Sequence, residues 1–390
     1  MVGTFVSSSP DATPIEKGDV IAQIPWEYII SPDIKYKPYR YWSCRSIYNL
    51  ARELKLGEKS NVAPYVRYLL SQPRGVMPGE WTDAGQDFLV RVLGHGDLPP
   101  YEDTWRTKFD TQWIEGCTGS DDDEYESAAY WLAASRDEDT LMVPIYDMAN
   151  HSNDPKKLNT ASYKPSEVGE SFRFVATRRI LPGEQIYNCY NRCNQCSGDV
   201  DPNFDRKKCD TFSFYRTSDL FVNFGFVEDY PQNWLIEVPT APLDGAEDGS
   251  SDDDEEEEES ELEFCLERDT ESGELDAIWD EDGEPDERDA KWLKWQYQRL
   301  QKLYDEKETL EKELVVRDDD KKDDNGKKDE EEEASDGTSE KMTRWEWESI
   351  WRYHEALSRA IDAAIQSTVI EEEGDEEEGD EEEDGGRDEL

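Results

Sequence analysis

The residues of this chain best suited to chemistry lie in two separate blocks. The first is a short apolar run from Val143 that stops at Asp147, Asn150 and His151. The second passes from a Pro-Gly turn into an alternating segment that ends in Tyr190. Polar residues that favour turns end the first run, so we expect Asp147, Asn150 and His151 to lie where a buried strand or helical turn meets a cleft. The second segment is expected to be a strand that delivers the Tyr190 hydroxyl at its end. A carboxylate, an amide, an imidazole and a phenol placed there could bind a polar ligand and orient a nucleophile.

The elements that must position these blocks form a mixed pattern of short strands and helices. Alternating apolar residues predict a strand over 171–177, and short runs broken by Gly, Pro and Asp predict two or three strands within 3–31. Apolar positions spaced three and four apart predict helices over 45–56, 62–70 and 128–135. We therefore expect an α+β fold of short strands with a helical insertion at about 45–135.

Arg136 follows directly on the last of these helices. A cation at this place could interact with the dipole of the helix that it ends.

Charge divides the chain unevenly. Residues 1–245 carry a net charge of −12, and residues 246–390 carry −41 of the total of −53. A region this acidic repels itself and cannot bury enough apolar surface to fold throughout. We expect a folded domain over 1–240 and three acidic or charged segments without order, namely a linker over 241–288, a linker over 317–342 and a tail over 371–390.

Two tryptophan-rich segments interrupt the acidic region. Apolar residues recur at helical spacing over 289–316 and again over 343–370, which predicts two amphipathic helices. Thr343 and Glu346 have the spacing of a capping box at the start of the second helix. The simplest arrangement is a hairpin packed on the first domain or on itself, and a partner-binding coiled coil is the alternative.

The two chemical blocks resemble the paired signature of SET-domain methyltransferases. The closest resemblance is to the branch of the Rubisco large-subunit lysine methyltransferases and the actin-histidine methyltransferases. In that family an Asp-x-x-Asn-His block precedes Gly-Glu-Gln-(Ile/Val)-Tyr-x-x-Tyr, and Asp147–His151 and Gly183–Tyr190 match both. Pro64–Leu69, Ser135–Arg136 and Asp219–Phe226 resemble flanking motifs of the same family. The resemblance covers about residues 1–240 and implies a SET-domain β-fold.

This resemblance implies roles for individual residues. Its cofactor is S-adenosyl-L-methionine, and the residues expected to contact it are Arg136, Asp147, Asn150, His151 and Phe226. Tyr190 is the expected catalytic residue, because its hydroxyl would orient the attacking nitrogen. Tyr187 and Phe224 are expected in the substrate channel. An apolar aromatic channel would disfavour a charged amine and so help a lysine lose its proton.

The activity that follows is methyl transfer to a protein lysine. Methylation of histidine is one alternative, because Phe224 replaces a tyrosine frequent in the family. The other is an inactive SET scaffold that binds basic proteins through the acidic region, since only Gly3–Val6 could stand for the end of the family's glycine loop.

An insertion rich in cysteine follows Tyr190. Cys193, Cys196 and Cys209 offer a Cys-x2-Cys knuckle and a third thiolate, which are weak candidates for a zinc site. No histidine lies in this loop, so free thiols are the favoured interpretation and a disulfide is a further one. We therefore predict no metal site.

The expected partner is a protein substrate, and the acidic charge favours a basic one such as a histone or ribosomal protein. The same charge repels phosphate, so we expect no nucleic-acid partner. No run of apolar residues could cross a membrane, and we expect a monomer. The amino terminus does not resemble a secretory signal, which favours a cytoplasmic or nuclear location. The ER lumen is the alternative if a signal peptide is missing from this chain, because Arg387–Leu390 resembles a retention signal.

Overall fold

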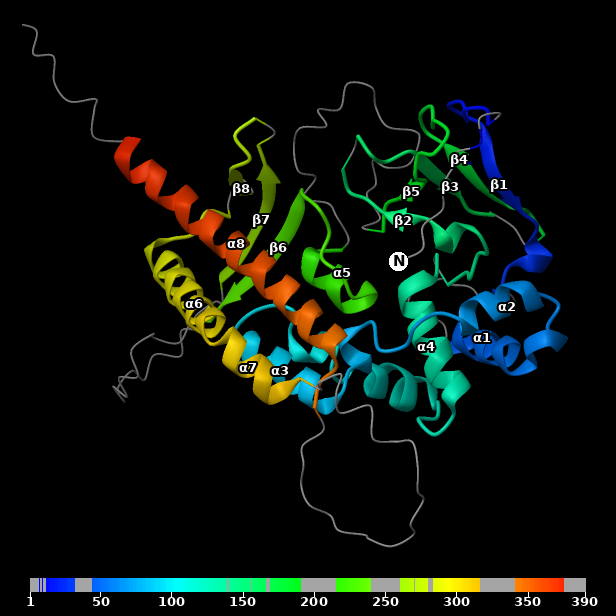
Figure 1. Cartoon of the computed structure of the whole chain (residues 1–390), viewed down its shortest axis with the longest axis horizontal. Coiled ribbons are helices and arrows are strands. Elements are labelled where there is room, and N and C mark those ends of the chain that lie inside the picture. Colours follow the sequence, from blue (N-terminus) through cyan, green and yellow to red (C-terminus); the bar gives the residue numbers. More distant parts are fainter. Residues whose placement is uncertain are drawn as a thin grey trace, which may run out of the picture.

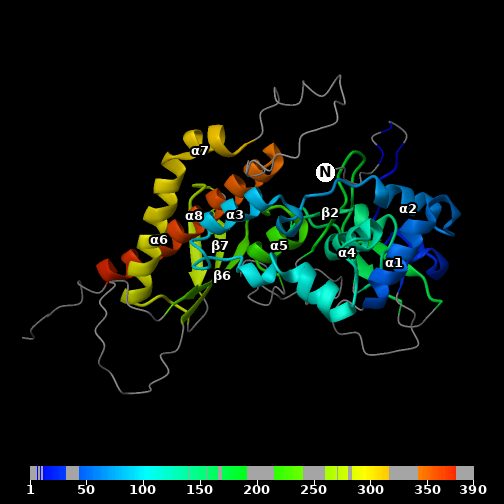
Figure 2. The same cartoon turned by 90° about the horizontal axis from the view of Figure 1, so that it is seen from below.

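The computed structural model of the chain describes most of the first 240 residues and separate parts of the rest. Described are Ser7, Ser9 and residues 12–31, 44–138, 140–154, 156–165, 169–190, 215–239, 260–269, 271–279, 283–315 and 341–374. Figure 1 shows two lobes. The first lobe contains β1 to β5 with α1, α2 and α4, and the second contains α3, β6 to β8 and α6 to α8. Helix α5 lies between them in both Figure 1 and Figure 2.

Short strands build the sheets of the first lobe. The antiparallel sheet has the order β1-β4-β3, from β1 (Val20–Ile24), β4 (Phe172–Ala176) and β3 (Thr160–Tyr163). Phe172, Phe174 and Ala176 alternate toward the core, as expected for a half-buried strand over 171–177. Within the described part of residues 3–31, only β1 is a strand. The expectation of two or three strands was wrong there, because Ile15 and Ile30 make isolated bridges rather than extended ladders.

The helices of the insertion lie between β1 and the first chemical block in the chain. They are α1 (Cys44–Leu56), α2 (Ala63–Leu70), α3 (Asp83–Val92) and α4 (Glu124–Arg136). The Asp123 carboxylate caps α4 by accepting from the backbone of Tyr125 and Glu126. Shorter turns of 3-10 helix are η1 (Trp26–Tyr28), η2 (Gly57–Lys59), η3 (Pro78–Glu80), η4 (Glu102–Thr104) and η6 (Tyr146–Met148), and η5 (Asp110–Glu115) is a π-helix.

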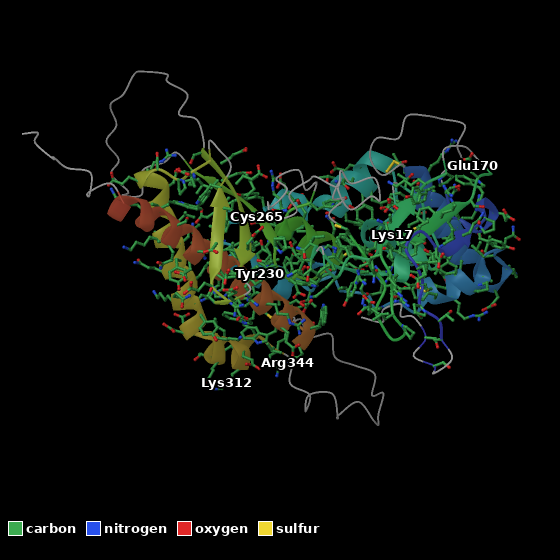
Figure 3. All side chains as sticks on the ribbon, turned by 90° about the horizontal axis from the view of Figure 1, so that it is seen from above. Lys17, Glu170, Tyr230, Cys265, Lys312 and Arg344 are labelled. Carbon is green, nitrogen blue, oxygen red and sulfur yellow. A yellow bond between two sulfur atoms is a disulfide. The ribbon has the colours of Figure 1, made fainter. Side chains whose placement is uncertain are left out.

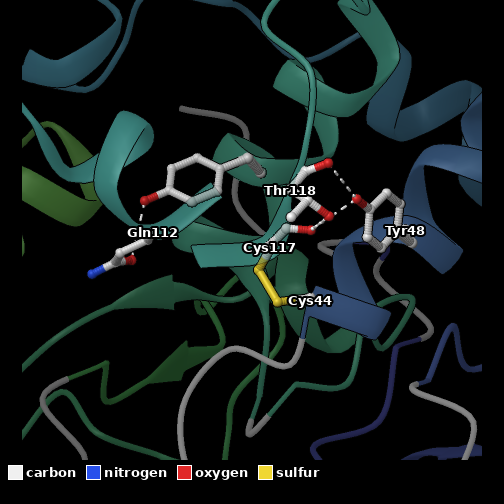
Figure 4. Close-up of a disulfide and its surroundings, with 6 residues drawn as sticks. Cys44, Tyr48, Gln112, Cys117 and Thr118 are labelled. Atoms are coloured by element: carbon white, nitrogen blue, oxygen red, sulfur yellow. Dashed lines mark hydrogen bonds between the residues drawn. A yellow bond between two sulfur atoms is a disulfide. The ribbon is translucent and has the colours of Figure 1, made fainter. Parts of the chain in front are cut away.

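A disulfide fastens this insertion. Cys44, the first residue of α1, is bonded to Cys117, which follows η5 (Figure 4). The Tyr48 hydroxyl donates to the carbonyls of Cys117 and Thr118 at 3.0 and 3.2 Å. This pairing was not expected, because spacing alone does not specify cysteine connectivity. Cys265, in the second lobe, is also disulfide-bonded.

The second lobe packs helices on a three-stranded antiparallel sheet of order β6-β7-β8. Its elements after α5 (Thr217–Phe224) are β6 (Gln232–Val238), β7 (Ser260–Arg268), β8 (Leu275–Trp279), α6 (Glu287–Asp305), α7 (Lys307–Leu314) and α8 (Arg344–Gly374). One hydrophobic core joins α3, α5, the sheet and α6 to α8. Figure 3 places Tyr230 and Cys265 in this lobe and Glu170 at the far end of the other.

Two expectations for the acidic region were wrong. The segment 241–288 was expected to be a linker without order, yet it contains β7 and β8, and β7 pairs with β6 across the boundary placed at residue 240. Leu262, Phe264 and Leu266 of β7 are buried, with Glu261, Glu263, Cys265 and Glu267 at the intervening positions, so a strand pattern lies within the acidic composition. The helix expected over 289–316 is broken at Glu306 into α6 and α7.

The start of α8 agrees with its expected capping box. The Glu346 carboxylate accepts from the Thr343 backbone N–H at 2.5 Å, and the Thr343 hydroxyl accepts from the Glu346 N–H at 3.2 Å. The same carboxylate accepts from the Thr82 N–H at 2.6 Å, at the N-cap of α3. Glu346 therefore caps two helices far apart in the chain. Among the helices of the described residues, none combines the length and apolarity needed to span a membrane.

Candidate functional site

The two chemical blocks lie side by side. Strand β2 (Asn150–His151) pairs in parallel with β5 (Tyr187–Asn188), so that Asn150 faces Tyr187 and His151 faces Asn188. The Ser152 N–H continues the ladder by donating to the Asn188 carbonyl at 2.9 Å. Backbone pairing therefore brings the amide and the imidazole of the first block next to the segment that carries Tyr190.

A buried asparagine fixes the position of β5. The Asn159 side chain, 0% exposed, donates to the Gln185 carbonyl and accepts from the Tyr187 N–H, both at 2.8 Å. The Thr160 hydroxyl donates to the Tyr187 carbonyl at 2.5 Å. These bonds satisfy backbone groups that the two-residue strand leaves unpaired. They hold the chain rigidly just before Tyr190.

Tyr190 closes back onto the first block through two hydrogen bonds. Its hydroxyl donates to the Ala149 carbonyl at 2.7 Å, and its backbone N–H donates to His151 Nδ1 at 3.0 Å. Burial raises the pKa of the Tyr190 hydroxyl above its ordinary value of 10.0. The phenol therefore keeps its proton at neutral pH and acts as a hydrogen-bonding group.

His151 is a neutral imidazole with a defined tautomer. Burial lowers its pKa to about 3, so the ring carries no charge at neutral pH. Nδ1 accepts a backbone proton, and the ring proton therefore lies on Nε2. Nε2 is buried and has no partner in the described residues.

Three rings lie around the ring of Tyr190, and we call these four rings together the aromatic cluster. It consists of His151, Tyr190, Phe224 and Phe226. The Tyr190 ring lies 4.7 Å from Phe224, 5.2 Å from His151 and 6.3 Å from Phe226, between ring centroids. Phe226 lies 5.7 Å from His151 and 6.1 Å from Phe224. Their contacts give Tyr190 an apolar setting.

Gly225 allows both phenylalanines to join the cluster. It ends α5 in the left-handed region with φ of 73°, which turns the chain sharply between Phe224 and Phe226. A Cβ at this position would lie 2.3 Å from the Val76 carbonyl oxygen. Glycine is therefore required both by the backbone conformation and by close packing.

Asp147 and Arg136 form a network under the turn that precedes β2. Asp147 has a side chain 0% exposed, and the Arg136 guanidinium lies 3.7 Å from its carboxylate. Arg136 also donates to the Asp147 carbonyl at 3.2 Å. Burial raises the pKa of Asp147 to about 7, while Arg136 and the Tyr65 hydroxyl act in the opposite direction. Arg136 thus meets the first block rather than only ending its helix.

The structure places most, but not all, of the expected site residues together. Tyr187 lies in β5 with its backbone hydrogen-bonded, and its ring contacts no member of the aromatic cluster in the described part of the chain. The cysteines at 193, 196 and 209 lie outside the described residues. Within those residues, no cluster of His, Cys, Asp and Glu could hold a metal ion.

Sequence reasoning missed the groups that support the site. Tyr65 and Tyr68 of α2 bond to Asp147 and Arg136, and their spacing of three on one helix face was the available signal. Glu228, two residues after Phe226 in the chain, is 6% exposed. Its carboxylate accepts a hydrogen bond from the Thr217 hydroxyl at 2.7 Å. A single buried carboxyl has no spacing signature in the sequence.

Comparison with known proteins supports the identity of the first lobe. No protein of curated function matches the chain. The family model of the SET domain matches residues 12–191, a range that includes β1 to β5 and ends one residue after Tyr190. Phe224 and Phe226 lie beyond the matched range. The chain therefore carries a SET domain over residues 12–191, with mixed helices and short strands, and such a domain is typical of protein methyltransferases that use S-adenosylmethionine.

Proposed function

We propose that this chain transfers a methyl group from S-adenosylmethionine to a lysine side chain of a protein. The observation that carries the proposal is the buried Tyr190 hydroxyl, held on the Ala149 carbonyl within a cluster of aromatic rings. The phenol donates its one proton to the Ala149 carbonyl, so its oxygen can accept a hydrogen bond from an attacking amine without bringing a charge into the site. The rings disfavour a charged ammonium by excluding water, which lowers the pKa of an entering amine.

The residues around β2 fit the proposed cofactor. Its carboxylate suits the Arg136 guanidinium, which is 21% exposed, and its adenine offers both donors and acceptors. The Asn150 amide makes no hydrogen bond within the described part of the chain, and His151 Nε2 is an orphaned buried donor. Unpaired polar groups next to a buried site are expected where a ligand completes the hydrogen bonding.

Each residue of this chain would have a limited task. Asn150 and Arg136 bind the cofactor, which supplies the electrophilic methyl group when bound. Phe224 and Phe226 exclude water from the acceptor nitrogen. Tyr190 orients that nitrogen for in-line displacement, in which positioning contributes most of the rate.

The remaining partners follow from charge. Residues 246–390 carry −41, which favours a basic protein substrate and disfavours nucleic acid. A monomer without a membrane partner is the simplest form of such an enzyme.

Three disulfide-bonded cysteines bear on the location of the protein. The Cys44–Cys117 bond and the disulfide of Cys265 are of the kind that persists in oxidising compartments and is rare in the cytosol and nucleus. They favour the lumenal alternative over a cytoplasmic or nuclear one. Alkylation of free thiols in freshly lysed cells, followed by mass spectrometry, tests this: labelling of Cys44 and Cys117 without prior reduction would exclude it.

Calorimetric titration with S-adenosylmethionine tests the proposal first. We expect binding by the wild-type chain and a loss of at least tenfold in affinity for Asn150→Ala, with exposed Asn61→Ala as the matched control. Labelled methyl transfer to a basic peptide containing lysine, beside the same peptide with histidine, then tests the acceptor. Transfer only to the histidine peptide would show that histidine, rather than lysine, is the methyl acceptor. Binding of S-adenosylmethionine without transfer to either peptide would favour an inactive scaffold.

A further inference from the structure

The geometry points to Tyr65 and Tyr68 as positioning residues that hold Arg136 and Asp147 in place for cofactor binding. This inference deepens the proposed function and rests on it. The two tyrosines come from α2, outside both chemical blocks, and within the described residues no hydrogen bond or ring contact joins them to the aromatic cluster or to β5.

Helix α2 and the short segment after it present a single face to the site. Tyr65, Tyr68 and Gln72 are spaced three and four apart, so they share one side of the helix. The Tyr65 hydroxyl donates to Asp147 Oδ2 at 3.0 Å. The Arg136 guanidinium donates to the Tyr68 oxygen at 2.8 Å and to Gln72 Oε1 at 2.7 Å. Each of these three side chains thus bonds to Asp147 or Arg136.

The contacts define the direction of the guanidinium. Arg136 Nη1 is shared between the Tyr68 oxygen and the Asp147 carbonyl, and Nη2 is held by Gln72. The guanidinium also lies 5.5 Å over the centre of the Tyr68 ring. A planar cation held from two edges and one face keeps little rotational freedom, so its remaining donors keep a fixed orientation.

Asp147 depends on the same helix for its charge. Its side chain is 0% exposed, and Oδ1 has no partner in the described residues. A buried carboxylate is costly unless hydrogen bonds and a cation compensate it. Here the compensation comes from the Tyr65 hydroxyl and from Arg136, and burial still leaves the pKa of Asp147 raised to about 7.

The charges of Arg136 and Asp147 act on the Tyr190 hydroxyl. Ala149, whose carbonyl accepts from Tyr190, lies two residues after Asp147, and Asn150 follows directly. Arg136 acts to lower the pKa of the Tyr190 hydroxyl, whereas Asp147 and Tyr68 act to raise it. The groups that face Asp147 are therefore Tyr65 and Tyr68 from α2, Arg136 from α4 and Tyr190 after β5.

Removal of the Tyr65 hydroxyl has a predictable sign. The hydroxyl stabilises the ionised form of Asp147, so Tyr65→Phe raises the pKa of that carboxyl further. A larger fraction of Asp147 is then protonated at neutral pH, and Arg136 loses its ion pair. Cofactor affinity should fall, and the pH at which it is half-maximal should rise. Tyr68→Phe removes a bond from Arg136 alone, so affinity should fall with the midpoint unchanged.

The experiment measures the dissociation constant of S-adenosylmethionine by calorimetry between about pH 6 and pH 9. For Tyr65→Phe we expect about tenfold weaker binding near neutral pH and an upward shift of the midpoint by about one pH unit. Tyr353→Phe is the matched control, because its buried hydroxyl donates to the Pro99 carbonyl and, within the described residues, bonds to no group of the Asp147 and Arg136 network. Its affinity and midpoint should equal those of the wild type.

The outcomes separate the two proposals. A folded wild-type chain that binds no cofactor at any pH overturns the proposed function. Wild-type binding together with an unshifted midpoint in Tyr65→Phe overturns the positioning role, whether or not affinity falls. If Tyr65→Phe does not fold, the test uses Tyr68→Phe, a substitution at a half-buried residue. Unchanged affinity of this variant for S-adenosylmethionine then overturns the inference.

Discussion

The Tyr190 hydroxyl and the Ala149 carbonyl are joined by a hydrogen bond of 2.7 Å across the seam between β5 and β2. The bond points the phenol at the backbone that precedes Asn150. It also leaves the oxygen of Tyr190 with a free lone pair inside the aromatic cluster. This hydrogen bond therefore links the proposed catalytic residue directly to the turn that is proposed to bind the cofactor.

Tyr190→Phe should separate cofactor binding from catalysis. The ring remains to pack against Phe224, but the hydroxyl that orients the acceptor is lost. We expect the turnover number to fall about 100-fold, in line with the loss of one oriented catalytic group, and cofactor affinity to change little. Labelled-methyl transfer and calorimetry measure the two quantities. Tyr28→Phe, at a tyrosine 50% exposed, is the control, and undiminished turnover in Tyr190→Phe would rule out the role.

Glu228→Gln should change how stability depends on pH. Burial raises the pKa of Glu228 to about 8, from the ordinary value of 4.5 for a glutamate. The folded state therefore holds this proton more tightly than the unfolded state, so its contribution to stability is present at low pH and is lost as pH rises from 4.5 to about 8.

The amide in this variant cannot ionise and can still accept from Thr217. We expect wild type and variant to have similar free energies of unfolding at acid pH. Above about pH 8 the variant should be more stable by a few kcal/mol, because each pKa unit is worth about 1.4 kcal/mol. Urea titration at both pH values measures this, and equal stability in alkali would show that Glu228 ionises freely.

Glu346→Ala should destabilise the contact between α3 and α8. Glu346 is 3% exposed, and its carboxylate accepts from the backbone N–H groups of Thr82 and Thr343 at the N-termini of the two helices. The Thr82 and Thr343 hydroxyls still cap their helices in the variant, but loss of two hydrogen bonds to a buried charged group should lower the free energy of unfolding by about 2–4 kcal/mol. Thermal melting checks this. The nearby control is Glu348→Ala, which breaks only an exposed pair with Arg352 and should cost less than about 1 kcal/mol.

Cys44→Ser should reveal the contribution of the disulfide to the first lobe. The bond closes a loop with a sequence separation of 73, for which chain entropy gives a loss of about 4 kcal/mol. Denaturant unfolding under non-reducing conditions measures it. Cys117→Ser and the double variant should show the same loss as Cys44→Ser, because all three lack the same bond. A double variant markedly less stable than either single one would indicate separate packing roles.

Local pattern by itself determined several elements of both lobes. The helices α1 and α2, the strand β4 and the capping box of Thr343 with Glu346 follow from apolar spacing and cap chemistry, which act within a few residues. The types and order of residues in the two blocks were also sufficient to predict their shared site, because strand ends deliver the polar groups.

Tertiary structure alone decided how those groups are supported. Tyr65 and Asp147 are 82 residues apart, and only packing of α2 beneath the turn makes them partners. Composition concealed β7, because its glutamates face outward while Leu262 and Leu266 enter the core. Cys44 and Cys117 likewise have no spacing rule. Contacts between distant segments depend on how elements pack, and packing is a property of the whole chain rather than of any one stretch.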